Sequence, residues 1–451
     1  MNFSLLTQKY DVPAPRYTSY PTVPYWENSP STEQWVGSIR RTLESSKSPG
    51  WSLYIHIPFC ESLCTFCGCN NSITRNHGVE VPYVEQVLSE WSRYIQEIPE
   101  LKKAPLKVLH LGGGTPTFLS PESLRKLLAP IFQSTLREKE FEGSVEVDPR
   151  RTTKAHLELL REFGFNRISL GVQDLDPEVQ RVIHRNQSLE ETLEITRIAR
   201  DLGYQSVNWD LIYGLPLQTL EKIERTAHAT LMARPDRIAL YSFALVPWIK
   251  PQQRIFKDSD LPVGAEKRAL YERARSILMD QGGYREIGMD HFALPTDGLS
   301  HSMDSGTLHR NFMGYVDQRT DLLLGLGVSA ISETPECFHQ NEKVLNLYSQ
   351  RTQQGEIPTH RGHLLTNEDR MAREQILRLM TQWEVEIPEA SEQAVIREML
   401  SEMIADRLVE MKDSSLRVLP EGKPFLRNAC MALDRRLRAK QPHARVFSQS
   451  L

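Results

Sequence analysis

Apolar residues recur in short runs along the first half of the chain, and stretches of helical period separate these runs. The runs predict six buried strands, at residues 53–57, 108–111, 144–147, 167–172, 206–212 and 237–243. The stretches between them predict helices near residues 83–98, 121–132, 153–163, 189–202 and 220–233. Strands that alternate with helices favour a parallel sheet, and six of them predict an incomplete (β/α)6 barrel.

The rest of the chain predicts additions to this barrel. Residues 1–35 carry five prolines and predict an extended N-terminal arm. We expect the arm to serve the reaction more than folding. Residues 36–359 form the predicted catalytic domain, with the barrel core at about 51–245 and an extension after it. Residues 360–451 predict a small, mainly helical C-terminal domain, in which 408–411 and 416–419 read as a β-hairpin.

Four of the six cysteines fall within ten residues, directly after the first predicted strand. Cys60, Cys64 and Cys67 stand in a Cys-x3-Cys-x2-Cys pattern, and Cys69 follows. A disulfide framework is disfavoured because no signal peptide precedes the chain. A structural zinc site is the weaker alternative, since it would use two Cys-x2-Cys pairs separated by a longer loop. The pattern favours an iron–sulfur cluster with three protein ligands, which leaves one iron open to another ligand.

The ends of the other predicted strands also carry polar or flexible residues. A Gly-Gly-Gly-Thr-Pro-Thr segment at 112–117 follows the second strand, and its glycines suit a backbone that approaches a ligand and exposes its N–H groups to it. Glu146, Gln173 and Asp210 lie at the ends of the third, fourth and fifth strands. Parallel α/β folds place their sites at the carboxyl ends of strands, so these groups are predicted to meet in one site.

Composition and charge bear on whether the protein binds nucleic acid or a membrane. The 451 residues are 40% hydrophobic and 25% charged, as in ordinary globular proteins, and the net charge of −4 gives no support for a nucleic-acid partner. No apolar stretch approaches the length of about 20 residues that spans a bilayer, so no membrane segment is expected. Clustered free thiols without a targeting signal predict a cytoplasmic protein.

The cysteine loop resembles that of the radical S-adenosylmethionine (SAM) superfamily, in which an aromatic residue, here Phe66, precedes the third cysteine. Longer segments resemble the family of oxygen-independent coproporphyrinogen III oxidases. These segments lie at residues 16–22, 54–60, 67–70, 112–117, 210–216, 288–292, 308–312 and 327–331. They extend from the N-terminal arm into the last third of the chain, so the resemblance covers nearly all of it.

The resemblance implies oxidative decarboxylation of two propionate side chains of coproporphyrinogen III to vinyl groups, which gives protoporphyrinogen IX in heme biosynthesis. A [4Fe-4S] cluster held by Cys60, Cys64 and Cys67 would cleave SAM to methionine and a 5′-deoxyadenosyl radical. That radical would take a hydrogen atom from the propionate β-carbon. Loss of CO2 and one electron would then leave the vinyl group.

The resemblance also implies binding residues for two SAM molecules. The SAM on the cluster would contact Tyr54, Gly113, Glu146, Ala244 and Ile331. The second SAM would contact Phe66, Gly114, Thr115, Gln173, Arg185 and Asp210. One position departs from the family, because Met313 stands where glutamine is expected, and a thioether cannot donate an amide's hydrogen bonds.

Cys69, Arg16 and Tyr17 are the candidate catalytic groups beyond the cofactors. Cys69 is predicted to act near the substrate, and Arg16 and Tyr17 offer a cation and a hydroxyl for propionates. The implied partners are coproporphyrinogen III and an electron donor of flavodoxin or ferredoxin type, and a monomer is expected. The alternative from another class is a heme-binding chaperone, which would lack the last cysteine and the 16–21 segment.

Overall fold

The computed structural model describes residues 3–45, 50–440 and 446–450. Six parallel strands run side by side in sequence order and form the centre of the molecule. They are β1 (Trp51–Ile57), β4 (Pro105–Gly113), β5 (Leu136–Val147), β6 (Phe165–Gln173), β7 (Ser206–Tyr213) and β8 (Arg237–Ser242). The predicted incomplete (β/α)6 barrel is therefore confirmed, with all six strands in the expected order.

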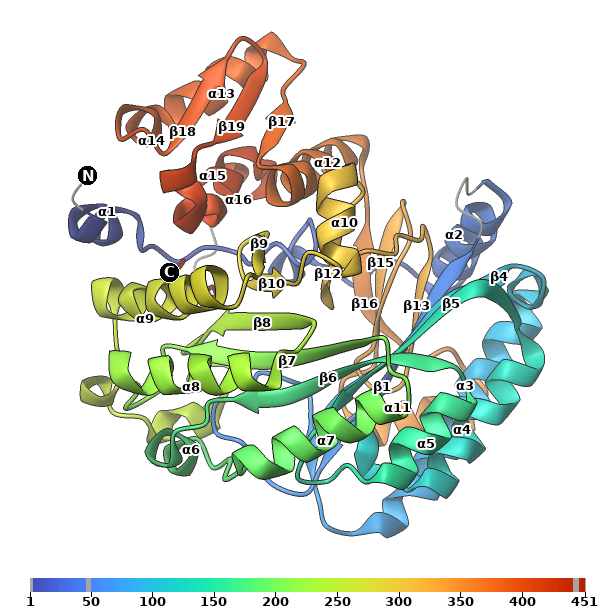
Figure 1. The fold of residues 1–451 in the computed structure, drawn as a ribbon. Helices are drawn as coiled ribbons and strands as arrows, with labels where there is room; N and C mark the ends of the chain where they lie inside the picture. The colour runs from blue at the N-terminus through green and yellow to red at the C-terminus, as the bar shows by residue number, and fades with distance from the viewer. Residues whose placement is uncertain (1–2, 46–49, 441–445, 451) are drawn as a thin grey trace.

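Helices cover the outer face of these strands (Figure 1). They are α3 (Glu80–Glu97), α4 (Pro121–Ser134), α5 (Lys154–Glu162), α6 (Pro177–Val182), α7 (Leu189–Asp201) and α8 (Leu220–Ala233). Side-chain caps begin several of them soon after a strand ends. Ser120 accepts from the Ser123 N–H at the start of α4, and Ser188 and Glu191 form a capping box at the start of α7. Such caps satisfy the unpaired N–H groups of a first turn, so the chain turns from strand to helix within a few residues.

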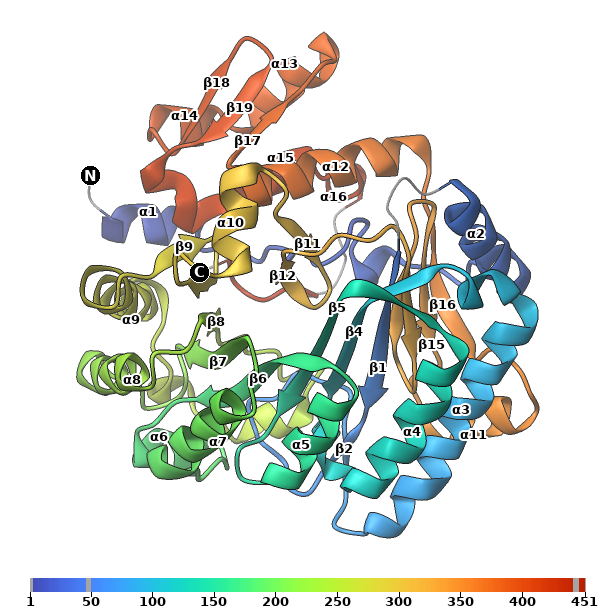
Figure 2. The ribbon, with the colours of Figure 1, turned by 45° about the vertical axis from the view of Figure 1, so that its right-hand side comes forward.

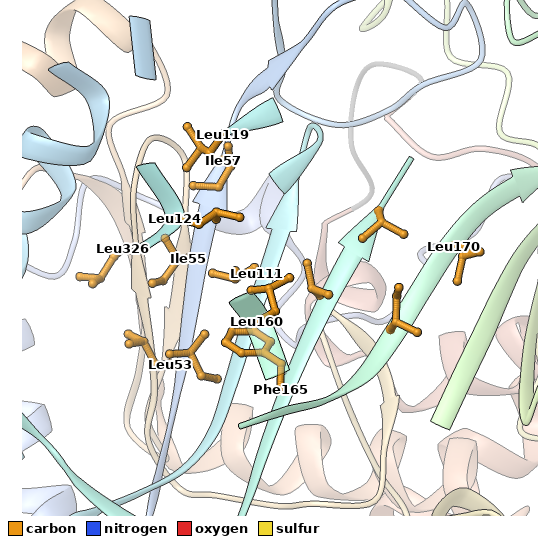
Figure 3. Close-up of a cluster of buried hydrophobic side chains, with 14 of the residues drawn as sticks. Leu53, Ile55, Ile57, Leu111, Leu119, Leu124, Leu160, Phe165, Leu170 and Leu326 are labelled. Atoms are coloured by element: carbon orange, nitrogen blue, oxygen red, sulfur yellow. The ribbon is translucent and has the colours of Figure 1, made fainter. Parts of the chain in front are cut away.

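Strand β1 is buried on both faces, and all seven of its residues are buried. One face is apolar: Figure 3 shows side chains from the strands and helices meeting in one cluster, with Leu53, Ile55 and Ile57 of β1 facing neighbours such as Leu111 and Leu124. The other face carries Ser52, Tyr54 and His56, as the alternation of side chains along a strand requires. The core thus fixes β1, and with it the start of the cysteine loop.

The central sheet continues beyond the six strands at both edges and reaches 12 strands. On the β1 side it adds β13 (Leu323–Leu326), β14 (Ile331–Glu333), β15 (Cys337–Asn341) and β16 (Thr359–Leu364). On the β8 side it adds β10 (His291–Ala293) and β9 (Arg285–Ile287), both antiparallel. The predicted boundary at residue 360 falls inside β16, which belongs to the main sheet.

Shorter elements complete the catalytic part of the chain. The cysteine loop holds β2 (Phe59–Cys60) and β3 (Ser72–Ile73), which pair in parallel. Between β8 and β16 lie α9 (Gly264–Ser276), α10 (Gly298–Ser305), β11 (His309–Asn311), β12 (Gly314–Val316) and α11 (Leu345–Gln353). Strands β11 and β12 form a hairpin of their own.

The C-terminal part is a separate group of helices around a small sheet, at the top of Figures 1 and 2. Its helices are α12 (Asn367–Gln382), α13 (Ala390–Met399), α14 (Ser401–Ala405), α15 (Leu426–Leu433) and α16 (Arg435–Ala439). Its strands are β17 (Glu384–Glu386), β18 (Val409–Lys412) and β19 (Ser415–Val418). The predicted hairpin matches β18 and β19, and β17 pairs with β19 as a third strand.

The N-terminal arm differs from the extended strap that its prolines predict. Residues Phe3–Tyr10 form helix α1, and α2 (Thr32–Ser45) begins before the predicted end of the arm. Tyr17 and Tyr20, each at most 3% exposed, pack into the apolar cluster of the C-terminal part. The prolines begin at position 13, so they leave α1 free to form and make extended only the stretch after it. The arm is therefore packed structure, contrary to the prediction.

The arm also meets the C-terminal end of the described chain. Pro13 and Gln449 form an antiparallel bridge, and the Ala14 N–H donates to the Ser448 carbonyl at 3.0 Å. Arg427 of α15 donates to the carbonyl oxygens of Ala14 and Pro15. No helix in the described ranges is long and apolar enough to cross a membrane.

Candidate active site

A cavity of about 580 Å3 opens along the inner face of the barrel, where the strand ends meet the arm and the cysteine loop. Of the predicted site residues, fourteen line it. They are Arg16, Cys60, Cys64, Phe66, Cys67, Cys69, Gly113, Gly114, Thr115, Glu146, Gln173, Arg185, Asp210 and Ala244. The structure therefore brings together residues that are spread over more than two hundred positions of the chain, as the strand-end argument predicts.

Each of the three predicted cluster ligands has a polar group beside its sulfur. The Thr115 hydroxyl lies 3.4 Å from the Cys60 sulfur. Arg185 Nη1 lies 3.7 Å from the Cys64 sulfur, and Asn71 Nδ2 lies 3.5 Å from the Cys67 sulfur. Donors aimed at sulfur stabilise the thiolate form, which is the form that binds iron.

The spacing of the cysteines separates the two metal hypotheses. Within the described residues, no three cysteine, histidine or carboxylate side chains converge closely enough to hold a single metal ion. A zinc site would need all of its ligands within about 2.0–2.3 Å of one centre. An iron–sulfur cluster binds each thiolate to a different iron, and three thiols around one cavity fit that larger group.

Cys69 lies beside Cys67 and is exposed. Its N–H donates to the Cys67 sulfur at 3.4 Å. The Cys69 side chain and this N–H together lower the pKa of the Cys67 thiol to about 6, whereas burial raises the pKa of the Cys60 thiol to about 11. Cys69 thus favours the thiolate of a cluster ligand while its own side chain faces the cavity.

A segment after β8 holds the cysteine loop in place. Gln253 Nε2 donates to the Phe66 carbonyl at 3.2 Å and to the Ala244 carbonyl at 3.1 Å. Gln252 Nε2 donates to the Cys67 carbonyl at 3.0 Å, and Lys250 Nζ to the Cys69 carbonyl at 2.7 Å. Three carbonyl groups of the cysteine loop, those of Phe66, Cys67 and Cys69, are fixed in this way.

The glycine segment after β4 serves close packing, not donation to a ligand. Gly113 has φ of +114°, and a Cβ there would lie 2.7 Å from the His56 ring. A Cβ on Gly114 would lie 2.6 Å from the Pro58 carbonyl oxygen. The N–H groups of Gly113, Gly114 and Thr115 donate to Glu146, Ile57 and Phe59. These three N–H groups, which the sequence predicts to be exposed to a ligand, are thus paired within the protein.

Glu146 faces the cavity at the end of β5 with two donors on its carboxylate. His110 Nε2 lies 3.2 Å from Oε1, and the Gly113 N–H lies 3.1 Å from Oε2. Burial works against the charged form, but these two hydrogen bonds and the charge of His110 outweigh it and hold the pKa of Glu146 below its usual value. The group is therefore an anion ready to meet a cationic ligand.

Asp210 on the neighbouring strand β7 behaves differently. It accepts from the Ser169 hydroxyl at 2.8 Å and from Asn208 Nδ2 at 2.9 Å. Burial, reinforced by the charge of Glu146, raises the pKa of Asp210 to about 6. Two carboxylates that face one cavity thus have pKa values shifted in opposite directions, because Glu146 has a histidine and a backbone N–H as donors whereas burial dominates at Asp210.

Arg185 links the cysteine loop to strands β5 and β6. Its Nη1 lies 3.4 Å from Asp148, and its Nη2 donates to the Gly171 carbonyl at 2.5 Å. Gln173, with φ of +68°, points from the end of β6 into the cavity. A Cβ on Gly171 would lie 2.9 Å from both Arg185 and Gln173, so the glycine leaves the space that these two side chains use.

Three predicted site residues lie outside the cavity lining. Tyr54 is buried behind it, where its ring packs against His110 and Phe312 and its hydroxyl lies 2.9 Å from His56 Nδ1. Ile331 packs with Trp26 and Phe338. Tyr54 is therefore buried and Ile331 half-buried against other side chains, and neither lines the cavity.

Tyr17 is the third predicted site residue that lies outside the cavity lining, and its position does not fit the catalytic role predicted for it. Its ring is 2% exposed, and its hydroxyl donates to Asp434 at 3.1 Å in the C-terminal part. Arg16, the neighbouring residue, does line the cavity and donates from Nη2 to the Ser242 carbonyl at 2.8 Å. The backbone at Tyr17, with φ of +49°, sends the two side chains to different places.

Sequence reasoning missed His110 and gave no role to the pair Asp290 and His291. His110 lines the cavity and positions Glu146. His291 Nδ1 lies 2.6 Å from Asp290 in a buried pair at the opposite side of the lining. His110 lies on β4 and His291 on β10, and both side chains line the cavity. The alternation of side chains between the two faces of β4 was the signal that could have identified His110.

The fold and the three cysteines at the end of β1 define a class of enzyme. The model of the radical SAM superfamily matches residues 54–230, which span the cysteine loop and the first five strands of the barrel.

Relatives place the chain more narrowly. The oxygen-independent coproporphyrinogen III oxidase of Pseudomonas aeruginosa is 38% identical over 447 residues and covers 96% of this chain and 95% of its own. That of Escherichia coli is 37% identical over 444 residues, with the same coverage of both chains. A solved structure of the Escherichia coli enzyme, described as a radical SAM enzyme, has a TM-score of 0.88 at 35% identity and covers 96% of this chain and 99% of its own. This chain belongs to the family of oxygen-independent coproporphyrinogen III oxidases.

Proposed function

We propose that the protein converts coproporphyrinogen III to protoporphyrinogen IX by oxidative decarboxylation of two propionate side chains to vinyl groups, without oxygen, in heme biosynthesis. The observation that carries the proposal is the single cavity that joins the three-cysteine loop to the polar strand ends. The family membership and its near full-length coverage support the same reaction.

The cofactors of the proposal are a [4Fe-4S] cluster and SAM. Cys60, Cys64 and Cys67 would hold the cluster, and the donors beside their sulfurs support that assignment. When bound, the cluster and SAM would supply the radical chemistry that removes a hydrogen atom from the propionate β-carbon. The protein itself binds, orients and shields the reactants.

Glu146 and its neighbours would bind the SAM on the cluster. Its carboxylate, kept ionised by His110 and the Gly113 N–H, suits the cationic part of SAM. Ala244 lies against the same cavity. Tyr54 and Ile331 would act from behind the lining, through the residues that they pack against.

A second SAM molecule belongs to the proposal as well. Phe66, Gly114, Thr115, Gln173, Arg185 and Asp210 line the cavity next to the first group. Arg185 suits a carboxylate, and Asp210 with Asn208 suits ribose hydroxyls. Met313 also lines this cavity, with Phe312 beside it.

The remaining partners are proposals of the same kind. Reductive cleavage of each SAM needs one electron, and each decarboxylation releases one. A one-electron donor of flavodoxin or ferredoxin type therefore fits the reaction. We propose a cytoplasmic monomer that binds neither nucleic acid nor membrane. All six cysteines are free thiols, which suits a reducing compartment.

An anaerobic assay with coproporphyrinogen III, SAM and a reductant tests the function. We expect protoporphyrinogen IX and 5′-deoxyadenosine to form together. Omission of SAM, or chelation of the iron before the assay, is expected to stop both. Formation of 5′-deoxyadenosine without any change in the porphyrinogen would contradict the proposed substrate and leave the radical SAM assignment intact.

A further inference from the structure

Seven arginines line the active-site cavity, and most of them are already neutralised by protein carboxylates. The pairs are Arg150 with Asp148, Arg151 with Glu61, Arg167 with Glu142, Arg185 with Asp148, and Arg237 with Asp297. Among the described residues, Arg16 and Arg310 form no such ion pair. These two lie next to each other, since Arg310 Nη2 lies 3.4 Å from the Arg16 carbonyl oxygen.

Arg310 is 5% exposed, and its Nε is a buried donor without a hydrogen-bond partner. Its guanidinium group lies 4.9 Å above the Tyr315 ring, which fixes its plane but supplies no anion. A buried cation without a counter-ion is costly in free energy. The fold therefore keeps a charge here that an anionic ligand would neutralise.

The groups around Arg310 leave this corner short of negative charge. Asp290 faces the corner and its charge acts on both Arg16 and Arg310, but its Oδ1 lies 2.6 Å from His291 Nδ1. One carboxylate is thus shared between a histidine and two arginines. Arg427, on the far side of Arg16, donates to backbone carbonyl groups. Burial is the main cause that lowers the pKa of Arg427 to about 9, and the charge of Arg16 acts in the same direction.

Three separate elements build this corner of the cavity. The N-terminal arm supplies Arg16, the hairpin of β11 and β12 supplies Arg310, and β10 supplies His291. Gly314 of the hairpin lies against the histidine, where a Cβ would stand 3.5 Å from its Nε2. Planar guanidinium groups bind carboxylates with two parallel hydrogen bonds, so the corner suits a carboxylate ligand.

We propose that Arg16 and Arg310, with His291 beside them, form a subsite for a propionate of the substrate that is kept in the product. The inference rests on the proposed function, in which two of four propionates lose CO2 and two remain. A carboxylate that leaves as neutral CO2 gives up its charge during the reaction. Cations that bind the charged ground state would slow that loss, so they belong with a propionate that does not react.

The product of the reaction gives a clean test. Coproporphyrinogen III carries four propionates, whereas protoporphyrinogen IX carries the two retained ones. We expect Arg310→Gln, in the anaerobic enzyme with its cluster, to raise the Kd of both molecules by the same factor, about tenfold or more. Arg16→Gln is expected to do the same from another element, and Arg310→Lys is expected to recover part of the loss.

Arg151→Gln is the matched control, because it removes a cavity arginine that already has a carboxylate partner. Its Kd values are expected to stay within about twofold of those of the unchanged protein. Iron content and the thermal midpoint of each variant show that the cluster and the fold are intact. Formation of 5′-deoxyadenosine from SAM without substrate checks the radical machinery independently.

Three results would overturn the inference. Unchanged Kd values in both Arg16→Gln and Arg310→Gln would remove the subsite. Weaker binding of coproporphyrinogen III alone would assign it to a reacting propionate. An equal loss in Arg151→Gln would reduce the effect to the overall charge of the cavity. Failure of the unchanged protein to bind either porphyrinogen would instead refute the proposed function itself.

Discussion

The Tyr17 hydroxyl donates a hydrogen bond to Asp434 at 3.1 Å and ties the N-terminal arm to the C-terminal part of the chain. The bond is buried, and Asp434 also accepts from the Leu437 N–H at 2.9 Å at the start of α16. The Asp434 carboxylate therefore caps helix α16 and also anchors the N-terminal arm at Tyr17. The neighbouring residue, Arg16, lines the cavity, so this contact helps to position it.

Tyr17→Phe is expected to lower the free energy of unfolding by about 1–2 kcal/mol, because Asp434 loses one buried donor. Denaturant unfolding of the anaerobic protein measures this. Formation of 5′-deoxyadenosine is expected to change little. Tyr25→Phe is the control, since the Tyr25 hydroxyl donates to the Lys440 carbonyl at an exposed position. Loss of turnover at unchanged stability would restore a catalytic role for Tyr17.

Serine in place of Cys60, Cys64 or Cys67 is expected to abolish the cluster, since a hydroxyl is a much poorer iron ligand than a thiolate. Iron analysis and the visible absorbance of the purified protein measure this. Cys69→Ser is expected to keep the iron and impair turnover. A Cys69→Ser protein that purifies without iron would make Cys69 a ligand.

Gly113→Ala is expected to lower the free energy of unfolding by about 1–3 kcal/mol. The residue has φ of +114°, and its Cβ would meet the His56 ring. The shift would also move the N–H that holds Glu146, so SAM cleavage should fall. Gly68→Ala is a matched control for stability, because nothing lies within 4 Å of its Cβ position. Equal stability of both variants would show that the backbone at Gly113 adapts.

Asp210→Asn is expected to stabilise the protein at neutral pH, because the fold raises the pKa of Asp210 from 3.8 to about 6. A raised carboxyl pKa favours folding when the group is protonated, and this contribution is lost as pH rises through about 6. The stability difference between Asp210→Asn and the unchanged protein should therefore shrink as pH falls from 7.5 to 5. Unfolding free energies at several pH values measure it, and a difference that is constant with pH would contradict the raised pKa.

The barrel was predictable because short apolar runs mark its strands and a stretch of helical period follows each of the first five. Strand β1 extends only two residues beyond the predicted 53–57. The added strands β9, β10 and β13–β16 were not predicted, because they are 3–6 residues long and they join the barrel sheet only through the pairs of β13 with β1 and of β10 with β8. Their burial comes from the sheet edge that they cover, which no local period reveals.

The candidate site shows the same difference between residues that local sequence places and residues that distant contacts place. Residues at strand ends, such as Glu146 and Asp210, reach the cavity because the sheet brings them there. Tyr17 was misjudged because its partner Asp434 lies 417 residues away in the chain. The glycines were judged from their freedom alone, whereas the contacts of His56 and Pro58 decide what they do.

The bridge between Pro13 and Gln449 also constrains how the protein is made. Arg427 and the Pro15 carbonyl oxygen that it binds are 412 residues apart, so a ribosome adding about 5–20 residues per second needs roughly 20–80 s between them. The barrel strands are made within that interval, while the arm still lacks the C-terminal partners that it contacts in the folded protein. The contacts that hold the arm beside the cavity can therefore form only at the end of synthesis, after the barrel.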